Sequence, residues 1–345
     1  MSIIRELTPA VAGAAKPHQP RSLVAPRLSE APAFHLAIIL TPGFALMSFA
    51  SVIEPARGAN RVSGRKHYDW ALYSTGGGEV ESNSGITVRT RPLSELDPGR
   101  VDFVVLCAAS KAEQIADLEL ESTLRRLIRH GVAIGAVSTA SFILARAGLL
   151  DGRRCTLHWD YLEAFREAFP EVEASEDLYV IDDGVVTCAG ATAAIDMMLE
   201  VIRGHHGPAL ARAIAEQFLH GAIRTSEDVQ RGDLRQRLGV ANPTLLKAVG
   251  LMEESVESPQ APGDLAAEVG VSQRQLERHF RRYLGCTPAK YYMRLRLDRA
   301  RRLLRQTSLS VTEVAIASGF VALSHFAKAY RQQFGVRPRD DRGSR

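Results

Sequence analysis

The side chains best placed to do chemistry lie around Ser138. The residues on either side predict a buried strand over residues 132–137 that turns abruptly into a helix over residues 139–147. Such a corner exposes backbone N–H groups, and enzymes use it to hold a serine or cysteine nucleophile beside an oxyanion hole. His158 is the candidate base for the Ser138 hydroxyl. We can assign no acidic residue to orient this histidine, so the sequence predicts binding at the corner rather than catalysis.

The same corner offers groups that could hold a small molecule. Backbone N–H groups suit a carboxylate, and Glu54 beside an aromatic face suits an amine or a quaternary ammonium. Plainer interpretations stay open: Glu54 could pair with Arg57 or Arg61, Ser138 could only cap a helix, and His158 could be a satisfied, partly buried histidine. The residues that we predict to contact a ligand are Glu54, Ser110, Ser138, Thr139, His158 and Trp159. The four cysteines are widely spaced, which predicts a reducing compartment and neither a metal nor a cofactor.

A helix-turn-helix pattern occurs twice in the C-terminal part of the chain, over residues 265–280 and 314–330. Each copy begins with a short apolar helix that ends at a glycine, Gly270 or Gly319, which can take the positive φ of a tight turn. A second helix follows with two apolar residues four apart, Leu276 with Phe280 and Phe326 with Tyr330. This layout is typical of proteins in which one helix braces another in the DNA major groove.

A long helix over residues 287–306 is expected between the two copies. Met293, Leu297, Ala300 and Leu304 recur at helical spacing and predict its buried face, while six arginines occupy the remaining surface. An 18-residue helix spans roughly 27 Å, close to the ~34 Å between successive major-groove faces of B-DNA. The sequence therefore predicts two reading helices held at a fixed separation.

The outward positions of the two reading helices define the predicted DNA contacts. Arginine and glutamine suit bidentate contacts with guanine and adenine, whereas other cations position the protein on phosphates. The predicted base contacts are Gln273, Arg274, Gln275, Arg278 and Arg281 in the first copy, and Leu323, Ser324, His325 and Lys328 in the second. Arg282, Lys290 and Arg331 are assigned to phosphates. The alternative is that these are only solvated helix faces.

Charge separates the C-terminal module from the rest of the chain. Residues 261–345 hold 17 of the 43 Lys+Arg and 7 of the 39 Asp+Glu, so the other 260 residues hold 26 against 32. A basic module on an acidic body predicts that only the module meets a polyanion. No apolar run reaches 18 residues, so we expect no membrane span.

The order of strands and helices predicts the fold class. Strands alternate with helices from residue 34 to residue 219, which predicts an α/β domain with a mostly parallel sheet covered by helices on both faces. The C-terminal domain is predicted to be all-α with two helix-turn-helix units. The expected divisions are a disordered tail over 1–32, a ligand-sensing domain over 33–222, a linker over 223–242 and a DNA-binding domain over 243–340.

The C-terminal segment resembles the AraC/XylS family of bacterial transcription regulators over about residues 258–338. The most specific stretches are Val314-Ala315-Ile316-Ala317-Ser318-Gly319-Phe320, Ser324-His325-Phe326 and Phe334-Gly335-Val336-Arg337-Pro338. The resemblance implies two helix-turn-helix units joined by a long helix. A departure is Val321-Ala322-Leu323, where the family more often has small polar residues.

Residues 34–219 resemble the ThiJ/PfpI group, which has the class I glutamine amidotransferase-like fold. The landmarks are Pro42-Gly43, Glu54-Pro55, residues 145–150, His158-Trp159 and residues 188–193. Enzymes of this group carry a cysteine that matches Ser138 here, and an acidic residue that matches Ser48. The resemblance therefore implies an inactive domain. The GlxA-like branch of AraC proteins, which pairs these domains, is associated with amino acids and with betaine- or carnitine-like compounds.

Together these observations predict a cytoplasmic bacterial transcription regulator that is not an enzyme. Its expected partners are double-stranded promoter DNA, RNA polymerase, a second copy in a homodimer and a small nitrogen-containing effector, an amino acid or a quaternary amine. By the habit of the family it is expected to be an activator. Two alternatives stay open: an amidase or related hydrolase with Ser138 as nucleophile, fused to a DNA-binding module, and a nonspecific nucleic-acid-binding protein.

Overall fold

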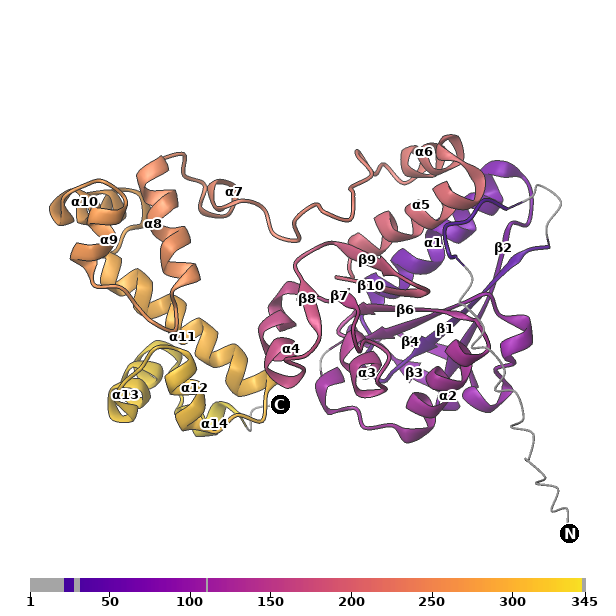
Figure 1. The fold of residues 1–345 in the computed structure, drawn as a ribbon, viewed down its shortest axis with the longest axis horizontal. Helices are drawn as coiled ribbons and strands as arrows, with labels where there is room; N and C mark the ends of the chain where they lie inside the picture. Colours follow the sequence, from indigo (N-terminus) through magenta and orange to yellow (C-terminus); the bar gives the residue numbers. More distant parts are fainter. Residues whose placement is uncertain (1–21, 28–31, 110, 343–345) are drawn as a thin grey trace, which may run out of the picture.

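The computed structural model describes residues 22–27, 32–109 and 111–342. It shows an α/β domain and a helical domain connected by a long segment, with the helix α4 (Leu162–Ala168) of the first domain lying against the long helix α11 (Pro288–Gln306) of the second (Figure 1). The predicted fold class is confirmed for both parts of the chain. Within the described residues, we find no helix with the length and hydropathy needed to traverse a lipid bilayer.

The N-terminal domain is built on an eight-stranded sheet with the strand order β3-β4-β2-β1-β5-β6-β10-β9. The pairs from β4 through β10 are parallel, whereas the outer pairs β3–β4 and β9–β10 are antiparallel. The strands are β1 Phe34–Leu40, β2 Tyr68–Ser74, β3 Gly76–Glu81, β4 Thr87–Pro92, β5 Phe103–Ala108, β6 Ala133–Ser138, β9 Tyr179–Asp182 and β10 Val185–Cys188. A separate parallel pair consists of β7 Arg154–Thr156 and β8 Glu173–Ser175.

Both faces of the central strands of the sheet are buried, as the apolar run of β1 shows. Leu36, Ile38 and Leu40 lie in one core with α1 (Leu46–Ser63), α5 (Ala193–His206) and α6 (Pro208–Gln217). Ala37 and Ile39 point to the other core, which contains α2 (Leu118–Arg129), α3 (Ser141–Arg146) and α4. Alternate residues of a strand point to opposite faces, so a continuous apolar run buries both. Short 3-10 helices lie at Leu93–Glu95, Pro98–Arg100, Ala112–Gln114 and Trp159–Tyr161.

Several boundaries differ from those that the sequence predicts. Apolar spacing in the sequence predicts helices over residues 44–57 and 113–130. The first, α1, starts at Leu46 and continues to Ser63, and the second, α2, starts only at Leu118, where Asp117 caps it. Strand β3 was not predicted because its glycines hide the alternation of side chains. The predicted disordered tail extends too far, because Leu23 is buried in the core and Arg27 N donates to His205 O at 3.1 Å. The rest of that tail, residues 1–21 and 28–31, lies outside the described residues.

The helical domain contains two hydrophobic cores that share α11. Its helices are α7 Leu234–Leu238, α8 Pro243–Glu254, α9 Pro262–Glu268, α10 Gln273–Leu284, α11, α12 Val311–Ala317, α13 Leu323–Phe334 and α14 Pro338–Asp341. The beginning of α11 packs through Tyr291 and Tyr292 into the core with α8, α9 and α10. The predicted apolar face continues with Leu297 and Leu304 into the second core, with α12 and α13. One helix therefore fixes both helix-turn-helix units.

A buried carboxylate holds the second unit against α11. Asp341 is 1% exposed and accepts hydrogen bonds from Tyr330 Oη at 2.6 Å, Arg301 Nε at 2.9 Å and Arg305 Nη2 at 2.6 Å. Burial by itself raises the pKa of Asp341, but the bonds from Tyr330, Arg305 and Arg301 outweigh burial and hold the pKa below its usual value. The negative charge of Asp341 therefore stabilises the junction of α11, α13 and α14.

We predict that Asp341→Asn lowers the free energy of unfolding by about 1–3 kcal/mol at pH 7, because charge-assisted hydrogen bonds are lost. The folded-state pKa is depressed, so the contribution of Asp341 is complete above the unfolded-state value of about 3.9 and disappears as the pH falls through the folded-state value. Denaturant unfolding at several pH values, followed by circular dichroism, measures the difference between wild type and variant. The exposed neighbour Asp340, whose carboxylate pairs with Arg339, provides the control Asp340→Asn. Equal losses in the two variants would refute this role.

Candidate nucleic-acid interface and ligand site

Helix α10 presents a polar face, as the sequence predicts. Leu276 and Phe280 are fully buried, whereas Gln273, Arg274, Arg278 and Arg281 are exposed, and so is Lys290 at the start of α11. A capping box begins the helix: Gln275 N donates to Ser272 Oγ, and Gln275 Oε1 accepts from Ser272 N. Gly285 ends it in the left-handed conformation. The helix is thus fixed at both ends, with arginine and glutamine side chains outward.

Gln275 is placed differently from the expectation that it reads a base. Its Oε1 accepts from Ser272 N at 2.9 Å and from Ser272 Oγ at 3.0 Å, so its acceptor atom is engaged within the protein. A bidentate contact with adenine needs both the donor and the acceptor of the amide. The signal was present in the sequence, because Ser272-Gln273-Arg274-Gln275 matches the capping-box pattern. We therefore assign Gln275 to the start of the helix.

Helix α13 repeats this arrangement with different side chains. It buries Phe326 and Tyr330 and exposes the predicted residues Leu323, Ser324, His325, Lys328 and Arg331. Both α10 and α13 have 12 residues, and both end at a left-handed glycine. No side chain caps α13, because Ala322 occupies the position that Ser272 has in α10. The backbone design is repeated, but the chemistry of the exposed face is not.

Five of the six arginines of α11 do not form the free surface that the sequence suggests. Arg296 donates to the carbonyl oxygens of Ser318 and Gly319 and lies 4.1 Å from the centre of the Phe320 ring. Arg301 and Arg305 hold Asp341, as described above. Arg299 and Arg302 point to the N-terminal domain. These side chains fix the module internally and against the α/β domain, so we do not count them among the DNA contacts.

The predicted corner after β6 is present and crowded. Ser138 has a φ of +64° and is 8% exposed. Gly190 approaches it so closely that a Cβ on Gly190 would lie 2.8 Å from both Ser138 Cβ and Ser48 Oγ. Ser48 Oγ accepts from Ala191 N at 2.7 Å. Two hydroxyls thus occupy the places where the resemblance implies a thiol and a carboxylate, and Ser48 can supply neither a strong base nor a charge.

Some of the other predicted ligand contacts are engaged elsewhere. The Glu54 carboxylate accepts from Arg57 Nε at 2.9 Å, so the surface pair foreseen as the plainer interpretation forms. Thr139 is buried and its hydroxyl donates to the carbonyl oxygen of Ala109. Trp159 lies under the Arg231 guanidinium, 4.2 Å from its carbon atom to the ring centre. Ser110 lies outside the described residues.

His158 contacts the Ser138 corner through its backbone N–H group rather than through its imidazole ring. Its N–H donates to Ser138 O at 3.3 Å, and its Nδ1 accepts from Asp160 N at 3.3 Å. Burial lowers the pKa of His158, against the opposing effect of the Asp160 charge. A neutral ring with Nδ1 engaged as an acceptor is the cap of the short helix Trp159–Tyr161. This geometry matches the plainer interpretation, a satisfied histidine, more closely than a catalytic base.

A charged cleft of about 1140 Å³ separates the two domains and was not foreseen from the sequence. Trp159, Arg231 and the side chains of α4, α8 and α11 line it. Ion pairs cross between the domains beside it: Arg299 with Glu163, and Arg302 Nε with Asp160 Oδ1 at 3.8 Å. Arg299 also pairs with Glu257, within its own domain, at 2.5 Å.

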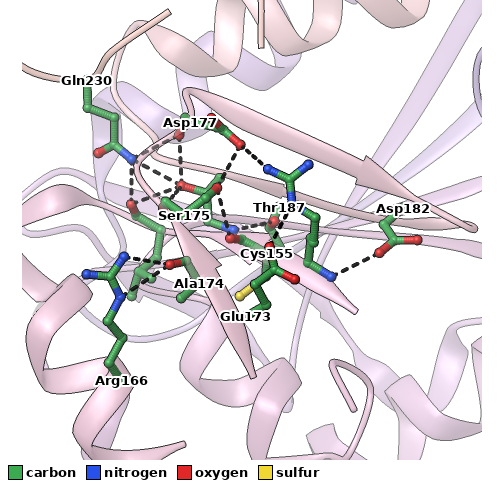
Figure 2. Close-up of polar contacts among 12 residues, drawn as sticks. Cys155, Arg166, Glu173, Ala174, Ser175, Asp177, Asp182, Thr187 and Gln230 are labelled. Carbon is green, nitrogen blue, oxygen red and sulfur yellow. Dashed lines mark hydrogen bonds and ion pairs between the residues drawn. The ribbon is translucent and has the colours of Figure 1, made fainter. Parts of the chain in front are cut away.

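The segment between α6 and α7, residues 218–233, connects the two domains, and we call it the connecting segment. Gln230 anchors it on the N-terminal domain (Figure 2). Gln230 Nε2 donates to Thr156 Oγ1 at 3.1 Å, Leu157 O at 2.9 Å and Asp177 O at 3.0 Å. Its Oε1 accepts from Trp159 N at 2.7 Å. Earlier in the segment, Arg224 forms an ion pair with the buried Asp196 at 2.6 Å. The predicted linker, residues 223–242, is therefore held on the α/β domain up to Gln230, and Leu234 and Leu238 of α7 pack on the helical domain.

Comparisons with known proteins match both halves of the chain. A profile described as a helix-turn-helix domain matches residues 265–344, and the DJ-1/PfpI family profile matches residues 36–204. The HTH-type transcriptional regulator GbdR of Pseudomonas aeruginosa is 44% identical over 307 residues, covering 89% of this chain and 83% of that protein. CdhR of the same organism, another HTH-type transcriptional regulator, is 44% identical over 305 residues, which cover 88% of this chain and 90% of CdhR. The HTH-type transcriptional regulator GlxA of Rhizobium meliloti is 39% identical over 304 residues, which cover 88% of this chain and 94% of GlxA.

Proposed function

Because this chain belongs to the HTH-type transcriptional regulators that join a DJ-1/PfpI domain to an AraC-type DNA-binding domain, we propose that it activates promoters in response to a small nitrogen-containing metabolite. It is a DNA-binding regulator. The sign of regulation, the effector, and the residues that bind the effector and the DNA are our proposal. We further propose that it acts in the cytoplasm as a homodimer that contacts RNA polymerase.

The main support for the DNA interface is that two similar helices, α10 and α13, are packed on the same long helix, α11. Helices α10 and α13 each bury two aromatic or aliphatic residues and turn a face without buried side chains outward. Recognition helices contact base edges with such faces, and their N-terminal residues lie deepest in the groove. We propose that Gln273, Arg274, Arg278, Arg281, Ser324, His325 and Lys328 face the bases, and that Lys290 and Arg331 contact phosphates.

The Ser138 corner supports a binding role without turnover. An acyl-transfer enzyme needs a nucleophile with a base in hydrogen-bond reach and a group to orient that base. Here Ser48 and Ser138 are both alcohols, and His158 Nδ1 is engaged by Asp160 N. The corner keeps a strained backbone at Ser138 and at Ala191, whose φ is +48°, and such strain is common at ligand sites.

The Glu54 carboxylate is paired with Arg57, so it does not itself support binding of an amine. We therefore propose the effector class from the family resemblance. We predict that an amino acid or a methylated amine raises the melting temperature of the full chain, because a ligand at 100 times its dissociation constant stabilises the folded state by about 2.7 kcal/mol. A thermal-shift screen of these compounds measures the effect. The test variant is Ser138→Ala, which removes the hydroxyl from the corner without adding bulk and should reduce the shift. A screen in which no such compound shifts wild type would refute the effector class, and an undiminished shift in the variant would refute the site.

Residues 156–163, which we call the coupling segment, connect the corner to the DNA-binding domain. His158 N bonds to Ser138 O, and Trp159 N bonds to Gln230 of the connecting segment. Asp160 and Glu163 pair with Arg302 and Arg299 of α11. An effector can shift only an equilibrium between states that it binds unequally. We propose that occupancy of the corner displaces the coupling segment and so changes how α11 is held.

Base and phosphate contacts can be separated by mutation. We predict that Arg274→Ala relaxes discrimination at one base pair, at a cost of about 1–3 kcal/mol, because a bidentate contact with guanine is lost. Lys290→Ala should weaken binding to all duplexes alike and reduce the slope of log affinity against log salt by about one. Titrations of selected and single-substituted duplexes at several salt concentrations measure both effects. Uniform weakening in both variants would instead indicate a nonspecific charge patch.

The attachment of the connecting segment through Gln230 can also be tested by mutation. In Gln230→Glu a carboxylate replaces the amide and cannot donate to the carbonyl oxygens of Leu157 and Asp177. The two lost bonds together contribute about 1–3 kcal/mol, so we expect trypsin to cleave after Arg231 at least about five-fold faster in the absence of effector. Mass spectrometry of timed digests measures the rate. The control is Gln236→Glu at an exposed position of α7; equal rates in the two variants would contradict an anchoring role for Gln230.

A further inference from the structure

Apolar side chains are exposed at the start of α13, where a reading helix meets the bases. Val321 is 105% exposed and Leu323 is 45% exposed, whereas the apolar residues Phe326 and Tyr330 of the same helix are fully buried. Leu323 is the first residue of α13, and Val321 precedes it by two positions. Neither side chain belongs to the core that α12 and α13 form with α11.

The corresponding position in the first unit is polar. Helix α10 starts at Gln273 behind the cap Ser272, and Arg274 follows. Helix α13 starts at Leu323 behind Ala322, and Ser324 follows. The second unit also has one more residue between its turn glycine and its reading helix, since Gly270 is followed by Val271 and Ser272 but Gly319 by Phe320, Val321 and Ala322. This additional residue accompanies the exposure of Val321.

The surroundings of the apolar pair favour DNA over a protein as the occupant. Ser324, His325, Lys328 and Arg331 are exposed on the same helix, and α13 contains no acidic residue, whereas α10 contains Glu277. The pair is therefore continuous with a face that is cationic or neutral throughout, as a surface against a polyanion should be. The C5-methyl group of thymine is the apolar group that the major groove presents at base edges.

We propose that α13 recognises thymine by apolar contact of Leu323 and Val321 with its methyl group, while α10 recognises purine edges through Gln273 and Arg274. This inference rests on the proposed DNA-binding function and adds what each unit reads. The operator subsite of the second unit is then specified by shape and methyl groups rather than by bidentate hydrogen bonds. Two chemically different subsites on one rod also fix the direction in which the chain lies on its operator.

The test replaces thymine by deoxyuridine, which removes only the methyl group. A preferred duplex is first selected from a random library with the full-length protein, and each thymine is then replaced in turn. We expect at least one thymine at which the replacement weakens wild-type binding about four-fold, the effect of losing one buried methyl group. Leu323→Ala should weaken binding to the thymine duplex and lose most of this sensitivity, leaving less than about two-fold, because the side chain that buries the methyl group is gone. The control Ile316→Ala changes another exposed apolar residue of the second unit, on α12, and should retain the full sensitivity.

The outcomes separate this inference from the proposed function. If no preferred duplex can be selected, sequence-specific binding itself fails. If a duplex is selected but no thymine is sensitive, or if Leu323→Ala remains as sensitive as wild type, the thymine contact is overturned while DNA binding stands. If Leu323→Ala binds every duplex like wild type but no longer recruits RNA polymerase, the apolar pair serves a protein partner. Melting curves of Leu323→Ala and Ile316→Ala that match wild type establish that the folded state is being compared.

Discussion

Burial of one face of α11 in two separate cores is the constraint on which the architecture depends. The helix has 19 residues, so its axis is about 28 Å long. Tyr291 and Tyr292 fix its beginning to the first helix-turn-helix unit, and Leu297 and Leu304 fix the remainder to the second. Neither reading helix can move along the rod without exposing one of these cores. The separation of α10 and α13 is thus set by packing rather than by a flexible connection, which suits reading of successive groove segments.

The outer face of the same helix is used for attachment to the α/β domain. Arg299 pairs with Glu163 and Arg302 with Asp160, so the coupling segment contacts α11, the connecting segment and the Ser138 corner at once. In the corner the fold keeps the strained backbone at Ser138, yet two alcohols replace the acid and thiol that the resemblance implies. We propose that a molecule bound at the Ser138 corner changes the contacts of α11 through the adjacent coupling segment.

The sequence predicted what depends on local pattern and failed where distant partners decide. Apolar and alternating runs predict strands over residues 34–40 and 68–74, which are the bounds of β1 and β2. The buried residues of α10, α11 and α13 follow helical spacing. Arg299 and Trp159 could not be placed, because their partners Glu163 and Arg231 lie 136 and 72 positions away in the chain. The Gln230 anchor was missed for the same reason. Gln275 is different, because the capping-box pattern from Ser272 to Gln275 is local and visible in the sequence, although its outward position alone predicts a base contact.

We propose that α10 and α13, held on the rigid helix α11, together read a defined DNA sequence. The most direct measurement is the affinity of the full-length protein for a selected duplex and for a scrambled duplex of identical composition, at moderate ionic strength. We expect a preference for the selected duplex of at least about 10³-fold, which lies at the lower end for specific regulators. Equal affinity for the two duplexes would contradict it, because electrostatic attraction of the basic module to phosphates would then account for all of the binding.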